Sequence, residues 1–331
     1  MEIQARIAGF VALGQELMKQ NNPALEEVKQ RAQVENAWFI PRFIDASIHQ
    51  IYKQFLQEQA LMEWAALYPQ ISKTCTHKKI GIVMAGNIPL VGFHDLLSTL
   101  MAGHIAVVKL STKDKVLMEY VIATLIKIKP QWKEQIIIQD QLKNCDAYIA
   151  TGSNNTSQYF EYYFGKFPHI IRKNKTSIAI LNGNESAETL DLLADDMMLY
   201  FGMGCRNVTQ LWVPTGYAFE PLLAALNKYD FLLDNHKFKH NYDYQLALLM
   251  MTRQFYMNSG AVLLSENPSP FAAISQVHYQ FYEPENIPTF NMEDIQCIVG
   301  KGGLDYGSLQ APRLDQYADG VDTLSFLARL N

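Results

Sequence analysis

The stretch IGIVMAGNIPLVGFHDLLSTLMAGHIAVVKL, residues 80–110, decides the fold of this chain. Its first six residues, IGIVMA (80–85), form a short apolar run that predicts a buried strand, and IAVVKL (105–110) predicts a second one. The intervening PLVGFHDLLSTLMAG (89–103) predicts a helix. Two strands joined by a helix of this length indicate a right-handed βαβ unit on a parallel sheet.

The same alternation continues towards the C-terminus. Further strands are predicted at QIIIQ (135–139), AYIAT (147–151), SIAIL (177–181), VTQLWV (208–213), AVLLS (261–265), HYQFYE (278–283) and DIQCIVG (294–300). Helices are predicted at KDKVLMEYVIATLIKI (113–128), SQYFEYYF (157–164), AETLDLLADDMMLYF (187–201), YAFEPLLAALNKY (217–229), residues 242–257 and VDTLSFLARL (321–330). Residues 3–68 also predict helices, and Pro41 suits the first turn of one of them.

These elements predict an α/β protein of two domains, which 331 residues are enough to build. Residues 1–175 combine a helical N-terminus with a Rossmann-type parallel sheet, and residues 176–331 form a second α/β domain that includes the C-terminal segment. No G-x-G-x-x-G motif follows the first strand, so a nucleotide would be held in another way. No linker separates the two regions, and we therefore expect the site in a cleft between tightly packed domains.

Composition excludes several classes of function. The net charge is −5 and no basic run is present, which argues against nucleic acid or an anionic membrane as a partner. No apolar stretch approaches the length of a membrane span, and the N-terminus lacks a signal-peptide pattern. The four cysteines contain no C-x-x-C pair, which indicates neither a disulfide framework nor a zinc site and favours a reducing, cytoplasmic location; they are Cys75, Cys145, Cys205 and Cys297.

Metal binding is not expected either. His236 and His240 are four residues apart and could share a helix face, but no carboxylate or cysteine completes a ligand set with them.

One cysteine stands in a segment suited to chemistry. In FGMGCRNVTQLWVP (201–214), Cys205 lies among glycines that allow a tight backbone and beside Arg206, whose charge could stabilise a thiolate. A small buried cysteine flanked by glycines is equally common as simple packing, so this segment alone leaves both interpretations open.

Four segments occurring in order carry a family resemblance: residues 85–112, IATGSNNTSQYF (149–160), IIRKNKTSIAIL (170–181) and residues 201–214. Together they resemble the aldehyde dehydrogenase superfamily. More closely, the chain is similar to the acyl-CoA reductase family related to the fatty-acid reductase of bacterial luminescence. NHKFKHNYDYQ (235–245), QCIVG (296–300) and YADGVDTLSFL (317–327) also resemble that family. The resemblance covers roughly residue 80 to the end and implies an aldehyde-dehydrogenase-like fold.

The resemblance implies two catalytic residues. Cys205 corresponds to the nucleophile, whose backbone N–H would also bind the oxyanion. Asn87 corresponds to the asparagine whose amide donates to the same oxyanion, a contact worth on the order of 3 kcal/mol. Without the family context, Asn87 followed by Pro89 is equally an ordinary strand-to-helix turn.

Cofactor contacts follow from the same resemblance. Lys109 matches the lysine that reaches the cofactor ribose, although a solvated lysine at a strand end is the plain alternative. The glutamate that often binds the 2′-hydroxyl is replaced by Thr112, which Lys113 follows; this favours NADPH, with NADH as the alternative. Thr151, Gly152 and Ser153 form a turn before a helix, where Ser153 suits the N-cap and free N–H groups suit the pyrophosphate or the nicotinamide side of the cofactor. Most turns of this kind only cap a helix.

The family's hydrolytic base is missing. The superfamily segment that carries this glutamate aligns with IIRKNK (170–175), which places Ile171 at the glutamate position. No carboxylate lies between Glu161 and Glu185, so a shift of the alignment does not restore one. Without this base an acyl-enzyme would persist until a hydride or a thiol removes it.

The sequence therefore predicts NAD(P)H-dependent reduction of an acyl thioester, an acyl-CoA or an acyl carrier, to an aldehyde through an acyl-cysteine intermediate. The alternative is a non-catalytic subunit that binds acyl thioesters or acyl carriers on a degenerate fold. A reductase for an acyl phosphate would share the same cysteine. A homodimer is the default expectation for this superfamily.

Overall fold

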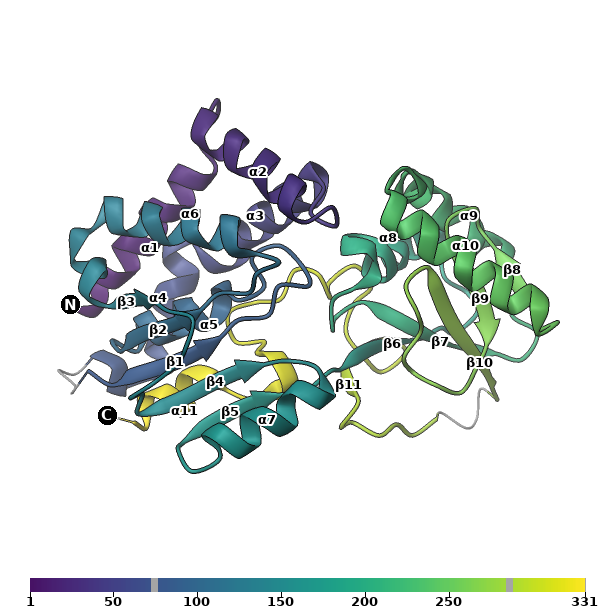
Figure 1. The fold of residues 1–331 in the computed structure, drawn as a ribbon. Coiled ribbons are helices and arrows are strands. Elements are labelled where there is room, and N and C mark those ends of the chain that lie inside the picture. The colour runs from purple at the N-terminus through teal and green to yellow at the C-terminus, as the bar shows by residue number, and fades with distance from the viewer. Residues whose placement is uncertain (73–76, 284–287, 331) are drawn as a thin grey trace. The chain divides into compact units, whose positions relative to one another are not determined.

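The computed structural model describes residues 1–72, 77–283 and 288–330. Cys75 lies outside these residues. The chain divides into two compact units: unit 1 comprises Met1–Asn174 and Pro312–Asn331, and unit 2 comprises Lys175–Ala311. Each unit is an α/β structure built on its own sheet, as the sequence predicts (Figure 1).

The sheet of unit 1 has five strands in the order β3-β2-β1-β4-β5, and all neighbours are parallel. The strands are β1 (Lys79–Val83), β2 (Ile105–Lys109), β3 (Ile136–Ile138), β4 (Ala147–Thr151) and β5 (His169–Arg172). The apolar runs predicted β1 to β4 because parallel strands are buried on both faces. The sequence prediction missed β5, whose four residues HIIR are too short to give a periodic signal.

The helices of unit 1 are α1 (Ile3–Leu17), α2 (Pro23–Glu35), α3 (Pro41–Phe55), α4 (Glu58–Ala66), α5 (Phe93–Met101), α6 (Lys115–Ile128), α7 (Asn154–Phe164) and α11 (Thr323–Ala328). Pro41 is the first helical residue of α3, as predicted. Helices α6 and α7 lie on opposite faces of the sheet (Figure 1). The core between sheet and helices is apolar and includes fully buried Phe10, Leu97 and Trp132.

The C-terminal segment corrects the predicted division of the chain. Residues 312–331 were expected with the second domain, but they pack in unit 1. The reason is that Leu324 and Leu327 of α11 are fully buried in the unit 1 core. The Leu327 carbonyl also lies 3.0 Å from Nε2 of the buried His104 imidazole.

The sheet of unit 2 has the order β11-β6-β7-β10-β9-β8, with all neighbours parallel except the antiparallel pair β8 and β9. Its strands are β6 (Thr176–Ile180), β7 (Val208–Pro214), β8 (Tyr256–Asn258), β9 (Leu263–Glu266), β10 (Gln276–Tyr282) and β11 (Ile295–Gly300). The helices are α8 (Ala187–Met198), α9 (Glu220–Leu226) and α10 (His236–Met251), which gather on one face of this sheet (Figure 1).

Three helix predictions in unit 2 are wrong in their bounds, and the helix expected at 217–229 covers only Glu220–Leu226. The helix expected at 242–257 begins at His236, because the Asn235 side chain caps it by accepting from the N–H groups of Lys237 and Phe238. The helix expected to reach residue 201 ends at Met198. Short 3₁₀ helices occur at Pro69–Ser72, Pro130–Glu134, Leu199–Gly202, Asn227–Asp234 and Ala318–Gly320. Within the described part of the chain, no helix combines the length and apolar character needed to cross a bilayer.

Candidate active site

The predicted cofactor residues and Asn87 follow the ends of three adjacent strands in unit 1. Val83 at the end of β1 pairs with Lys109, the last residue of β2. On its other side Val83 pairs with the residue of β4 that comes directly before Thr151, the last residue of that strand. Asn87 comes four residues after β1. Strand order reverses at β1, and ligands of open parallel sheets bind outside such a switch point.

The loop that carries Asn87 is fixed by hydrogen bonds to the two residues Pro89 and Leu90 that follow it closely. The Ser47 hydroxyl donates to the Pro89 carbonyl over 2.7 Å, and the Leu90 N–H donates to Asp114 Oδ2 over 2.7 Å. Leu90 has a φ of 58°, a conformation that bulky residues rarely adopt without such support. A side chain at Gly86 would overlap Ser111. The exposed Asn87 is therefore presented to solvent from a constrained loop.

The loop after β2 offers cations and a hydroxyl rather than an accessible carboxylate. Lys109, Thr112 and Lys113 are exposed, whereas Asp114 is buried. Burial raises the pKa of Asp114 well above its usual value. The Asn36 side-chain amide, at the end of α2, donates to the Lys113 carbonyl over 3.1 Å and so holds this loop in place. An anionic group of a ligand would meet no exposed negative charge among residues 109–113.

The turn after β4 has the predicted helix cap. Ser153 is the N-cap of α7, and its hydroxyl accepts from the Thr156 N–H over 3.3 Å. A Cβ at Gly152 would lie 2.9 Å from the Phe160 ring, so a side chain there would require Phe160 to move. Helix α7 thus begins at the sheet edge that carries Lys109 and Asn87, where unpaired N–H groups of a helix start suit an anion.

A buried ion pair lies behind this turn, and the sequence did not predict it. Arg172 of β5 donates through one guanidinium nitrogen to Asp95 Oδ2 over 2.6 Å and to Thr151 Oγ1 over 3.4 Å. Its other terminal nitrogen donates to Thr323 Oγ1 over 2.9 Å. Both charged side chains are less than a tenth exposed. The pair thereby joins β5, α5 and α11 and supports Thr151 from inside the protein.

Cys205 belongs to unit 2 and lies on the turn between α8 and β7. The backbone reverses through a left-handed turn, in which Tyr200, Phe201 and Gly202 have φ of 57°, 60° and 70°. Glycine adopts this conformation freely, as predicted for Gly202, but for Tyr200 and Phe201 it is strained. Cys205 itself is half-buried, so its side chain is partly accessible.

Arg206 contacts a second cysteine, Cys297. Its guanidinium lies 3.3 Å from Cys297 Sγ on β11. Burial raises the pKa of the Cys297 thiol, and the Arg206 charge opposes that shift. An effect of Arg206 on the Cys205 thiol therefore stays a prediction.

Lys175, the last residue of the IIRKNK segment, has a hydrogen-bond partner in the structure. Lys175 Nζ donates to the Met292 carbonyl over 3.0 Å. Ile171, at the position of the missing glutamate, lies half-buried in β5. The structure therefore leaves this position apolar.

Sequence reasoning missed two residues that hold the Cys205 turn. Asn207 and Ser177 are both fully buried and both hydrogen-bond to its backbone. The signal for Asn207 was its position two residues after the cysteine, before an apolar strand. Ser177 gave no local signal, because its contact depends on the pairing of β6 with β7.

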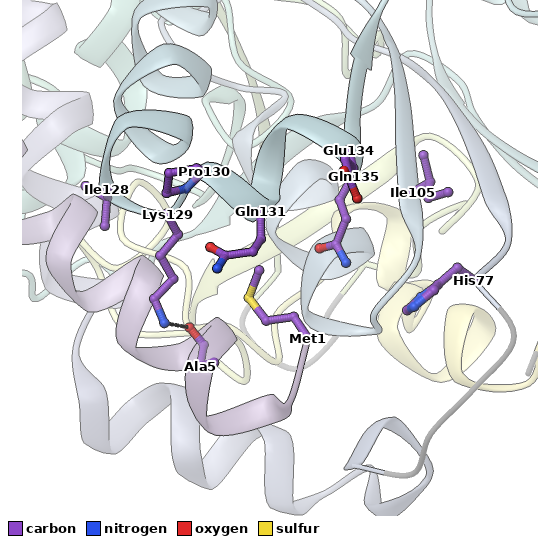
Figure 2. A pocket seen from close by; sticks show the side chains of 10 residues that line it. All are labelled: Met1, Ala5, His77, Ile105, Ile128, Lys129, Pro130, Gln131, Glu134 and Gln135. Carbon is purple, nitrogen blue, oxygen red and sulfur yellow. Dashed lines mark hydrogen bonds between the residues drawn. The ribbon is translucent and has the colours of Figure 1, made fainter.

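A groove of about 770 Å³ lies near the start of β2 and contains none of the predicted site residues (Figure 2). Lys129 Nζ donates there to the Ala5 carbonyl over 2.7 Å. The lining residues are Met1, Ala5, His77, Ile105, Ile128, Lys129, Pro130, Gln131, Glu134 and Gln135. Across residues 1–72, 77–283 and 288–330, no group of three or more histidine, cysteine or acidic side chains is arranged to hold a metal ion.

Comparisons with known proteins point to one family. A family model described as acyl-CoA reductase (LuxC) matches residues 15–229. Curated proteins give no match.

Solved structures give matches at low sequence identity. An aldehyde dehydrogenase from Mycobacterium tuberculosis in complex with NAD⁺ has a TM-score of 0.61 at 13% identity, over 86% of this chain and 69% of that one. An indole-3-acetaldehyde dehydrogenase variant from P. syringae, bound to NAD⁺, has a TM-score of 0.62 at 12% identity, over 86% and 68%. A Burkholderia cenocepacia protein described as an aldehyde dehydrogenase has a TM-score of 0.63 at 13% identity, over 86% and 71%. These matches show an aldehyde-dehydrogenase-like fold.

Proposed function

Because this chain belongs to the LuxC family of acyl-CoA reductases, we propose that it reduces an acyl thioester to an aldehyde through an acyl intermediate on Cys205. The observation that carries the proposal is the Cys205 turn, a strained and tightly hydrogen-bonded backbone that presents a half-buried thiol. Backbone strain of this kind is concentrated at functional sites.

In the proposed first step, the Cys205 thiolate attacks the thioester carbonyl carbon. A new C–S bond forms to Cys205, the bond to the sulfur of coenzyme A or of a carrier breaks, and that thiolate leaves and takes up a proton. The Asn87 amide and the Cys205 N–H would donate to the carbonyl oxygen while it is negatively charged.

The edge of the unit 1 sheet fits a nicotinamide dinucleotide. Gly152 carries no side chain at the start of α7, and the loop after β2 offers Lys109 and Thr112. Lys109 and Thr112 would hold the ribose, and the turn at Thr151–Ser153 would hold the pyrophosphate. When bound, the reduced nicotinamide supplies a hydride to the acyl carbon, which releases the aldehyde and the Cys205 thiolate.

The exposed Lys113 beside Thr112, and the absence of an exposed carboxylate among residues 109–113, favour NADPH because its 2′-phosphate is anionic. The apolar Ile171 at the position of the hydrolytic base favours reduction over oxidation to an acid, since no carboxylate is present there to activate water.

The test is intact-protein mass after incubation with a long-chain acyl-CoA, with and without NADPH. We expect an acyl adduct on the wild type that NADPH discharges with aldehyde formation, and no adduct on Cys205→Ala. Cys145→Ala is the matched control, because Cys145 is a buried thiol of unit 1 and its variant should keep the adduct. Acyl-CoA binding to the wild type without any adduct would exclude Cys205 as the nucleophile and favour a non-catalytic binding subunit.

A further inference from the structure

Two buried side chains hold the backbone around Cys205. The Ser177 hydroxyl on β6 donates to the Cys205 carbonyl over 3.0 Å. The Asn207 Oδ1 atom accepts from the Gly204 N–H over 2.8 Å. Both side chains are 0% exposed. Ser177 therefore fixes the peptide group after Cys205, and the Asn207 side chain fixes the Met203–Gly204 peptide group. The peptide group between Gly204 and Cys205 is held by the Asn207 backbone N–H, which donates to the Gly204 carbonyl over 3.0 Å.

Asn207 also ties this turn to the preceding helix. Its Nδ2 group lies 3.1, 3.2 and 2.9 Å from the carbonyl oxygens of Asp196, Met197 and Leu199. Carbonyls at a helix C-terminus lack partners within the helix, so this amide caps the end of α8. The Asn207 carboxamide thus bonds to the backbone both before and after the strained residues 200–202, through its donors and its acceptor respectively.

We infer that Ser177 and Asn207 are positioning residues that fix the direction in which Cys205 presents its thiol to the acyl carbon. The inference rests on the proposed function, in which Cys205 is the nucleophile. With the backbone held on both sides, the freedom that remains to the thiol is rotation about χ1. Positioning matters because a displacement of about 1 Å can lower a reaction rate about 100-fold.

Ser177 gives the cleaner test of the two residues. Ser177→Ala removes the hydrogen bond to the Cys205 carbonyl and a side-chain contact with the Cys297 thiol, and it leaves the packing volume nearly unchanged. Ser98→Ala is the matched control, because the Ser98 hydroxyl is also 0% exposed and donates to one carbonyl, that of His94, over 2.8 Å in unit 1. Both variants lose one buried hydroxyl, but only one of them touches the Cys205 turn.

The first readout is the single-turnover rate of Cys205 acylation by a long-chain acyl-CoA. For Ser177→Ala we expect this rate and kcat to fall roughly tenfold, with an unchanged KM for NADPH and a melting temperature close to that of Ser98→Ala. Ser98→Ala should acylate at the wild-type rate. Equal acylation rates in the two variants would overturn the inference, as would a loss in Ser177→Ala that only follows its unfolded fraction.

The second readout separates this inference from the proposed function. Peptide-resolved alkylation of Cys205 by iodoacetamide, followed against pH, reports the presentation of the thiol whether or not the protein is acylated. A shifted rate profile in Ser177→Ala, absent in Ser98→Ala, supports positioning even if the wild type forms no acyl adduct. An unchanged profile rejects it.

Asn207→Asp supplies a second variant. It keeps an acceptor for the Gly204 N–H and removes the donors to the end of α8. It should alter the same alkylation profile, and a folded Asn207→Asp protein with wild-type alkylation would count against the role of this residue.

Discussion

Replacing Arg172 by methionine should destabilise unit 1 strongly. The guanidinium lies 2.6 Å from Asp95 Oδ2 and 2.9 Å from Thr323 Oγ1, and the two charged side chains are 5% and 9% exposed. Arg172→Met leaves the Asp95 carboxylate buried without its cation. Breaking a buried pair from one side costs about 3–5 kcal/mol, so we expect a loss of that order in the free energy of unfolding.

An exposed ion pair provides the control. Arg313 donates to Asp315 over 3.1 Å, but its side chain is 69% exposed. Arg313→Met should cost less than about 1 kcal/mol. Replacing both partners of the buried pair, in Arg172→Met with Asp95→Leu, should recover much of the loss because no charge is then left buried.

Urea unfolding followed by tryptophan fluorescence measures these differences. Trp38, Trp64 and Trp132 belong to unit 1 and Trp212 to unit 2, so the signal is weighted towards the unit that carries the pair. A free energy of unfolding for Arg172→Met within about 1 kcal/mol of that for Arg313→Met would refute the reasoning. It would mean that Asp95 finds another partner or a route to water.

Two further stability predictions concern unit 2. Gly300 has a φ of +93° and an added Cβ would overlap the Ile180 carbonyl and the Tyr306 hydroxyl, whereas Gly302, at +76°, meets nothing within 4 Å. Gly300→Ala should therefore lower the free energy of unfolding by more than about 2 kcal/mol and Gly302→Ala by about 1 kcal/mol, and equal losses in urea titrations would contradict this. Burial raises the pKa of Asp196 to about 7 from 3.8, so the folded state binds the proton more tightly and stability falls as pH rises from about 4 to about 7. Asp196→Asn should flatten this decline, and a parallel pH profile of unfolding for wild type and variant would argue against Asp196 as its source.

The sequence predicted those elements whose signal is local. The apolar runs at 80–85 and 105–110 mark β1 and β2 because both faces of these strands are buried. The family resemblance was also carried by short contiguous segments, and the match over residues 15–229 confirms it. Ser153 showed its capping role in the same way, since a cap depends on neighbours within one helical turn. Its contact with a cofactor stays a prediction.

The features that the sequence did not reveal depend on residues far apart in the chain. Arg172 and Asp95 are 77 positions apart and meet only because β5 joins the sheet beside β4. Ser177 and Cys205 are 28 positions apart and meet through the pairing of β6 with β7. No periodicity or motif reports such pairs in a single sequence. The cleft expected between the two domains likewise stays a prediction.

Unit 1 is built from two separate segments of the chain, and this has a consequence for synthesis on the ribosome. The chain leaves unit 1 at Asn174 and returns to it at Pro312, so unit 2 is an insertion within its neighbour. A nascent chain that ends at Ala311 already contains all of unit 2 but lacks α11, which supplies the Thr323 hydroxyl to Arg172 and the Leu327 carbonyl to His104. Domains generally fold as units as they emerge. The unit whose synthesis starts first is therefore the one that is completed last.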